Sequence, residues 1–160
     1  MKLNDQINSH YGLFLNHLVQ VSDQELVLFL SEARINDTVT KEVKFNEDTE
    51  HFVSLDVNPI ETDDSCKKYK MTFKRFFAYQ VVEESSIQWD DDEVFEGKLY
   101  RMFSSSRFLN HIKANLNVDW YEKVPEMKYQ HFQVCGLDFI VDVAAHEDPT
   151  IEEVEQFLVQ

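Results

Sequence analysis

Carboxylates are the side chains of this sequence with the clearest potential for chemistry. The densest run is residues 90–93, Asp-Asp-Asp-Glu, and Glu83 and Glu84 precede it. Carboxylates bind divalent cations, but calcium loops place their oxygen ligands at alternating positions around a glycine turn. The acids of this run are consecutive, so along an extended chain they would point to opposite faces. The run therefore favours a solvated or partner-binding loop over a metal site.

Serine and cysteine offer a second kind of chemistry, nucleophilic catalysis, which needs a neighbouring base and an oxyanion hole. Residues 104–106 are three serines without the G-x-S-x-G pattern of a nucleophile elbow, and they favour the cap of a following helix. Cys135 follows His131 by four residues of an expected strand, which places the two residues about 13 Å apart at ~3.3 Å per residue. This distance is too large for His131 to act as a base on the Cys135 thiol. We interpret Cys135 as a buried structural thiol.

Metal and cofactor motifs are missing from the sequence. His146-Glu147-Asp148 is charged, but the chain has no H-E-x-x-H and no paired-cysteine motif of a zinc site. Three glycines in all leave no phosphate-binding loop and no dinucleotide-binding fingerprint. We therefore expect no catalytic residue, no metal ligand and no cofactor.

The overall charge narrows the classes of partner. The chain has 30 Asp and Glu against 15 Lys and Arg, a net charge of −15 over 160 residues. Such a surface repels nucleic acid and anionic membranes and accelerates association with basic proteins. A hydrophobic fraction of 43% with 13 Phe predicts a folded core. Two cysteines outside any paired motif, no apolar leader and no long apolar stretch predict a cytoplasmic protein.

The first half of the chain predicts mainly strands. Residues 3–18 fit one face of a helix, yet residues 13–19 also alternate as a strand would, and we favour a helix over 3–10 before a hairpin of 12–20 with 25–34. Two further strands are expected around 39–45 and 53–57, followed by an acidic loop over 61–65. Residues 69–81 give the clearest period-two pattern, with a bulge or bend expected where Arg75 falls on the apolar face.

The second half adds strands and two helices. A strand over 94–103 leads to a helix over 105–116, whose apolar residues recur at helical spacing, and then to a loop over 117–128. Residues 129–143 are expected to be β, with a bulge at Gly136 where the alternation changes parity. Asp148-Pro149 is typical of a helix start, which predicts a C-terminal helix running from 149 through Leu158.

These elements predict one domain over 1–160, because no repeat and no Gly/Ser linker divides the chain. The expected class is α+β, mainly β. Many strands and few helices predict a curved antiparallel sheet or a partly open barrel carrying a few peripheral helices.

Two stretches give the chain a family resemblance, namely the region from Phe95 to Leu109 and the region from His131 to Val143. They resemble a group of small bacterial proteins. In size and acidity the chain is similar to the immunity proteins of polymorphic-toxin and contact-dependent growth inhibition systems. The resemblance implies a cytoplasmic antitoxin that blocks a toxin domain by binding it. Immunity families share no catalytic signature, so the resemblance assigns no role to any single residue.

The sequence thus predicts a surface that docks a basic protein partner, a toxin domain, and does not bind nucleic acid or membrane. Its expected residues lie in and beside the acidic run; they are Glu83, Glu84, Trp89, Asp90, Asp91, Asp92 and Glu93. Aromatic residues beside charges are typical of interface anchors, although Trp89 and Phe95 also fit ordinary strand-end core positions. The alternative is a small-molecule-binding or enzymatic β-barrel, which should hold a large cavity with convergent polar groups.

Overall fold

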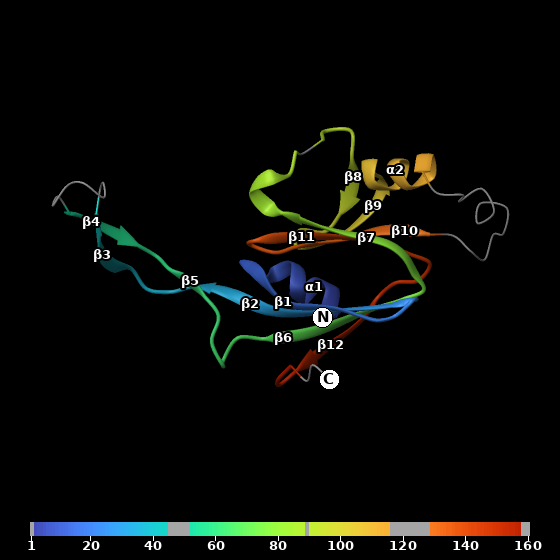
Figure 1. Cartoon of the computed structure of the whole chain (residues 1–160). Coiled ribbons are helices and arrows are strands. Elements are labelled where there is room, and N and C mark those ends of the chain that lie inside the picture. Colours follow the sequence, from blue (N-terminus) through green and yellow to red (C-terminus); the bar gives the residue numbers. More distant parts are fainter. Residues whose placement is uncertain (1, 45–51, 89, 116–128, 158–160) are drawn as a thin grey trace.

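Two antiparallel sheets lie one over the other in the computed structural model, and a two-stranded hairpin projects from their side (Figure 1). The structure describes residues 2–44, 52–88, 90–115 and 129–157. Over these residues strands predominate, so the expected α+β, mainly β class is confirmed. The sheets are antiparallel and do not close into a barrel, in agreement with that class.

The first sheet contains the N-terminal hairpin. Helix α1 (Leu3–Ser9) leads into it and buries Ile7 in the core, as predicted for residues 3–10. The apolar stretch from Leu26 to Leu30 is buried at every position; its strand lies in the middle of the sheet, and Phe29 on it contacts the rings of His17 and Phe157. In spatial order the strands are β1 (Gly12–Ser22), β2 (Glu25–Ile35), β6 (Lys68–Lys74) and β12 (Thr150–Val154), with β5 (Ile60–Glu61) on the end of β2.

The long period-two segment passes from one sheet to the other at Arg75, the predicted bend. Strand β6 pairs with β2 and β12 in the first sheet, whereas β7 (Phe76–Glu83) pairs with β11 in the second. Arg75 adopts a positive φ of 52°. This left-handed conformation turns the chain between the two layers.

The second sheet contains two hairpins that the sequence predicted differently. Its spatial order is β7, then β11 (Phe139–Ala145), β10 (Gln130–Cys135), β9 (Tyr100–Ser105) and β8 (Val94–Glu96). The single strand predicted over 94–103 is wrong, because the chain reverses at Gly97, where φ is +101°. Asn8 Oδ1 stabilises this turn by accepting the backbone N–H groups of three successive residues, Lys98, Leu99 and Tyr100, at 2.8–2.9 Å.

The predicted bulge at Gly136 is also wrong. The parity change there marks the end of one strand, and β10 and β11 form an antiparallel hairpin around residues 136–138. The backbone N–H of Gly136 donates to the carbonyl of Phe139, and a Cβ on Gly136 would lie 2.8 Å from that same oxygen. A turn and a bulge both change the parity of the alternation, so the sequence pattern did not distinguish them.

Helix α2 (Arg107–Asn115) confirms the helix predicted over 105–116, of which residue 116 lies outside the described ranges. It packs on the outer face of the second sheet, and the short 3-10 helix η1 (Glu84–Ser86) follows β7 (Figure 1). The predicted C-terminal helix from residue 149 is wrong. Residues 150–154 form β12, because the edge of β6 offers backbone hydrogen bonds and Ile151 packs against the core. Leu158 lies outside the described residues.

The main core fills the space between the inner faces of the two sheets, where apolar side chains of β2, β6, β10 and β11 meet. The predicted strands near 39–45 and 53–57 form the projecting hairpin, β3 (Val39–Lys44) and β4 (Phe52–Val57). Because side chains alternate along a strand, every core residue of the second sheet has neighbours that point to its outer face. That outer face carries the candidate site.

Candidate functional site

A row of four polar side chains crosses the outer face of the second sheet. Gln80 of β7 is the direct cross-strand partner of Asp142 of β11, which is opposite Gln133 of β10, which is opposite Arg101 of β9. Direct partners point to the same face of a sheet, so the register alone brings the four together. Hydrogen bonds connect them, from Gln80 Nε2 to Asp142 Oδ2 at 2.8 Å, from Gln133 Nε2 to Asp142 Oδ1 at 2.7 Å and from Arg101 to Gln133 Oε1 at 3.0 Å.

Asp142 is the centre of this row and is only 3% exposed. Besides the two glutamines, His131 donates to it from Nε2, at 2.8 Å from Oδ1. Burial by itself raises the pKa of the Asp142 carboxyl, but the hydrogen bonds from His131, Gln80 and Gln133 outweigh that effect and hold the pKa below its ordinary value. Asp142 is therefore a buried carboxylate that stays ionised at neutral pH.

His131 connects the row to the start of helix α2. Its Nδ1 lies 2.7 Å from Ser106 Oγ, and the same oxygen accepts the backbone N–H of Leu109 at 3.1 Å, as an N-cap does. Because an ionised carboxylate only accepts, His131 Nε2–H donates to Asp142, and Nδ1 on the other side of the ring shares a hydrogen bond with the Ser106 hydroxyl. The ring of Phe103 stacks on the imidazole at a centroid distance of 4.1 Å, and Phe108 lies at 5.0 Å.

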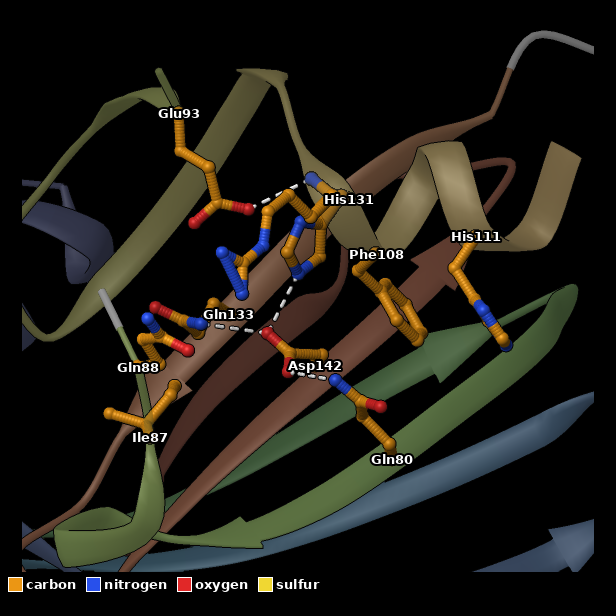
Figure 2. Close-up of a pocket in the computed structure, with 10 residues that line it drawn as sticks. Gln80, Ile87, Gln88, Glu93, Phe108, His111, His131, Gln133 and Asp142 are labelled. Atoms are coloured by element: carbon orange, nitrogen blue, oxygen red, sulfur yellow. Dashed lines mark hydrogen bonds and ion pairs between the residues drawn. The ribbon is translucent and has the colours of Figure 1, made fainter. Parts of the chain in front are cut away.

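These buried groups form the floor of a pocket of about 270 Å³ (Figure 2). Figure 2 shows Asp142 between Gln80, Gln133 and His131, with Phe108 and His111 of α2 on one side and Ile87, Gln88 and Glu93 on the other. The pocket thus lies between helix α2 and the segment from Glu83 to Glu93 that precedes β8, which we call the acidic segment. Its lining residues are Gln80, Ile87, Gln88, Glu93, Arg107, Phe108, His111, His131, Gln133 and Asp142.

Two residues of the acidic run, residues 90–93, contact the start of α2. Glu93 Oε1 accepts the backbone N–H of Arg107 at 2.9 Å, and Asp90 forms an ion pair with the Arg107 guanidinium at 3.2 Å. Carboxylates favour this position because the N-terminus of a helix carries unpaired N–H groups and a partial positive charge. Asp91 and Asp92 lie between them and are exposed. Trp89 lies outside the described residues.

The two earlier acids of the predicted site lie at the other end of the segment. Glu83 accepts the hydroxyl groups of Ser85 and Ser86, each at 2.7 Å, and these hydrogen bonds lower the pKa of its carboxyl. The backbone N–H of Glu84 donates to Asp138, and the residue lines a smaller cavity of about 200 Å³ beside the β10–β11 turn. Glu83 and Glu84 are exposed, but neither lines the larger pocket, whereas Glu93 does.

The other residues weighed for chemistry have structural surroundings. Ser106 caps α2 as predicted, and Cys135 is buried, as expected, with its pKa raised by burial to about 11. Glu147 pairs with Arg75. Among the residues that the structure describes, no group of three His, Cys, Asp or Glu side chains is arranged to hold a metal ion.

The polar row itself was missed by the sequence reasoning. Its signal was present between the core residues, because His131, Gln133 and Cys135 alternate with the apolar Phe132 and Val134. A strand that carries polar residues on its second face normally exposes them to water. Here helix α2 and the acidic segment cover that face, so His131 and Gln133 are buried.

Comparison with known proteins leaves the structure as the guide to function. No family model matches the chain, and no curated protein or solved structure matches it either. Within the described ranges, no helix has both the length and the apolar character needed to cross a membrane.

Proposed function

We propose that this protein is a non-catalytic immunity protein, an antitoxin that neutralises a cognate bacterial toxin domain by stoichiometric binding. One observation carries the proposal. The acidic segment singled out by the sequence and the pocket with the buried carboxylate form a single surface, because Glu93 of that segment lines the pocket. A recess bordered by negative charge is suited to receive a projecting basic group of another protein.

The charge distribution supports a basic partner. The chain carries a net charge of −15, and Asp91 and Asp92 are exposed in the loop that borders the pocket. Long-range attraction between opposite charges raises association rates and suppresses binding to other acidic proteins. Toxin nucleases have basic, phosphate-binding clefts, and carboxylates can take the place of phosphates in them.

The engagement of the polar groups supports a binding role over a catalytic one. Ser106 is a hydroxyl in hydrogen-bond contact with the imidazole of His131, yet it is 3% exposed, caps α2 and does not line the pocket. A nucleophile must reach its substrate, and the burial of Ser106 opposes that. The described buried polar side-chain atoms all have hydrogen-bond partners, so the floor is a satisfied structural network.

The second candidate function is a small-molecule-binding protein or an enzyme, and one observation favours it. Ser106, His131 and Asp142 form a continuous hydrogen-bonded chain, the order of nucleophile, base and acid that hydrolases use. Ser106→Ala distinguishes the two functions. It should leave toxin neutralisation intact if Ser106 is a cap, and it should abolish a hydrolytic activity if Ser106 is a nucleophile.

The proposed function also requires the protein to lie in the cytoplasm, where a toxin domain would act. Both cysteines are free and buried, which agrees with a reducing compartment.

Co-expression tests the proposal. The toxin domain encoded beside this gene should stop growth when expressed alone, and this protein should restore growth and co-purify with the domain at one-to-one stoichiometry. Ser106→Ala provides the catalytic control in the same assay. Failure to restore growth, or hydrolysis of a substrate that one side-chain change abolishes without unfolding, would contradict the proposal.

A further inference from the structure

The hairpin of β3 and β4, which we call the arm, projects from the side of the two sheets (Figure 1). Among the described strands, β3 and β4 pair only with each other. Hydrogen bonds fix the base of the arm. The backbone N–H of Asn36 donates to the carbonyl of Pro59 at 2.9 Å, and Asn58 Nδ2 donates to Thr38 Oγ1 at 3.0 Å. The arm therefore leaves the body from a defined base, and its strands extend into solvent.

The arm has the residue alternation of a sheet that buries one face. Val39 and Val43 alternate with the polar Thr40 and Glu42 on β3, and the register places Leu55 of β4 on the same face as the two valines. Yet Val39, Val43 and Leu55 are 42%, 45% and 46% exposed. Antiparallel sheets with this alternation normally pack their apolar face on a core, and a two-stranded hairpin by itself is marginally stable in water. The apolar face of the arm is thus typical of a surface that another molecule covers.

Charge selects a basic protein as the molecule that covers this face. The sequence from residue 39 to residue 57 contains five acids and two lysines, a net charge of −3. A second copy of this acidic chain, an anionic membrane or a nucleic acid would be repelled from it, whereas a basic protein would be attracted. Lys41 also lies on the apolar face, where a lysine contributes its aliphatic stem and keeps its ammonium group in water.

We propose that the apolar face of the arm packs against an apolar patch of the basic toxin domain, as a second contact beside the acidic segment. The identity of this partner rests on the proposed function. Each strand of the arm has six residues, so the face is about 20 Å long and smaller than the roughly 800 Å² per partner of a standard interface. The arm therefore adds to the acidic surface and does not replace it. Charge accelerates association, whereas burial of the arm slows dissociation.

Two matched variants test the proposal in a titration with the toxin domain encoded beside the gene. Leu55→Asn places an amide on the apolar face, and Ser54→Asn places the same amide on the opposite face of the same strand. Both positions are exposed, and neither change alters the net charge. Leu55→Asn should raise the dissociation constant about tenfold, mainly through faster dissociation, because the exposed half of a leucine loses its burial in the complex. Ser54→Asn should leave the constant unchanged within about twofold.

Salt separates this contact from the acidic surface. The loss caused by Leu55→Asn should persist when the salt concentration is raised, since apolar contacts are not screened, whereas the effect of replacing Asp90, Asp91 and Asp92 by Asn should shrink. Amide hydrogen exchange of the unaltered protein gives a measurement that needs no variant. Backbone amides of β3 and β4 should exchange more slowly in the complex than in the free protein.

The outcomes distinguish this proposal from the proposed function. A one-to-one complex that Leu55→Asn and Ser54→Asn affect equally, or in which exchange of the arm is unchanged, would overturn the arm contact and leave the proposed function standing. A free protein that dimerises through the arm, with Leu55→Asn breaking the dimer and sparing the toxin complex, would assign the face to a second copy and also overturn it. If the unaltered protein forms no complex with the toxin domain, the proposed function fails, and the arm contact fails with it.

Discussion

Truncation of Asp142 should destabilise the protein strongly, because the network around it is buried. Asp142→Ala removes the acceptor for two buried donors, His131 Nε2–H and Gln133 Nε2–H, in residues that are 1% and 4% exposed. A buried donor left without a partner costs about 1–3 kcal/mol. Gln80 is exposed and can turn its amide to water. Removal of the desolvated carboxylate offsets part of the loss, so we expect a net destabilisation of about 3 kcal/mol, within the range for broken buried pairs.

Equilibrium unfolding in urea measures this effect. With a slope of about 1–3 kcal/mol per M, the midpoint of Asp142→Ala should fall by on the order of 1 M or more. Asp138→Ala is the matched control, because it removes an exposed aspartate from the adjacent hairpin turn and should change the free energy of unfolding by less than about 0.5 kcal/mol. If Asp142→Ala and Asp138→Ala are equally stable, the row on the second sheet is not a structural network and the reasoning is refuted.

Four further outcomes are expected. Hydrogen bonds hold the pKa of folded Asp142 below the ordinary value of 3.8, so the ionised carboxylate stabilises the fold above that pH, and this contribution is lost as the pH falls through the lower folded pKa. The difference in the free energy of unfolding between the unaltered protein and Asp142→Asn should therefore shrink below pH 4. A difference that does not change with pH would contradict this expectation. Ser106→Ala should cost about 1–3 kcal/mol, since it removes the cap of α2 and the partner of His131, whereas the exposed neighbour Ser105→Ala should be nearly neutral in thermal unfolding. Arg75→Gly should keep stability within about 1 kcal/mol and Arg75→Val should lower it by roughly 1–2 kcal/mol, because a β-branched residue is strained at a φ of 52°; equal effects of the two changes would mean that the bend carries no strain. Replacing Asp90, Asp91 and Asp92 together by Asn should slow association with a basic partner at low salt in stopped-flow measurements, whereas neutralising Asp23, Glu152 and Glu155 should slow it less, and equal slowing would indicate that only net charge matters.

Much of the fold follows from local patterns in the sequence. The period-two alternation of residues 69–81 predicted a long strand with a bulge or bend at Arg75, and the structure has two strands, β6 and β7, that meet at this residue. The hairpin predicted for 12–20 with 25–34 is formed by β1 and β2, and the third serine of residues 104–106 caps the helix it was expected to cap. These features depend on neighbours in the sequence, so sequence reasoning reaches them.

The errors occur where partners distant in the sequence decide the structure. Ile151 and Val154 fit a helix by spacing, but the free edge of β6 makes a strand of the same residues. The turn after Gly97 depends on Asn8, which lies about ninety positions earlier and accepts three backbone hydrogen bonds there. No local pattern contains that contact.

For the candidate site too, sequence reasoning found the part that depends on sequence neighbours and missed the part that depends on distant residues. The acidic run was visible as a cluster of charge, and its residues Asp90 and Glu93 do lie beside the pocket. The floor was hidden, because Gln80 and Asp142 are 62 positions apart and meet only through the register of β7 and β11. Whether a polar residue of a strand is buried depends on which element covers that face of the sheet.

We propose that this protein neutralises a basic toxin domain through the surface formed by the acidic segment and the pocket. The most direct measurement is the dissociation constant of the complex with the toxin domain encoded beside it, for the unaltered protein, for the variant with Asp90, Asp91 and Asp92 replaced by Asn, and for the control with Asp23, Glu152 and Glu155 neutralised. We expect a one-to-one complex that the first variant weakens at least about tenfold and that the control weakens less. A complex that the two variants weaken equally, or the absence of any complex, would contradict the proposal.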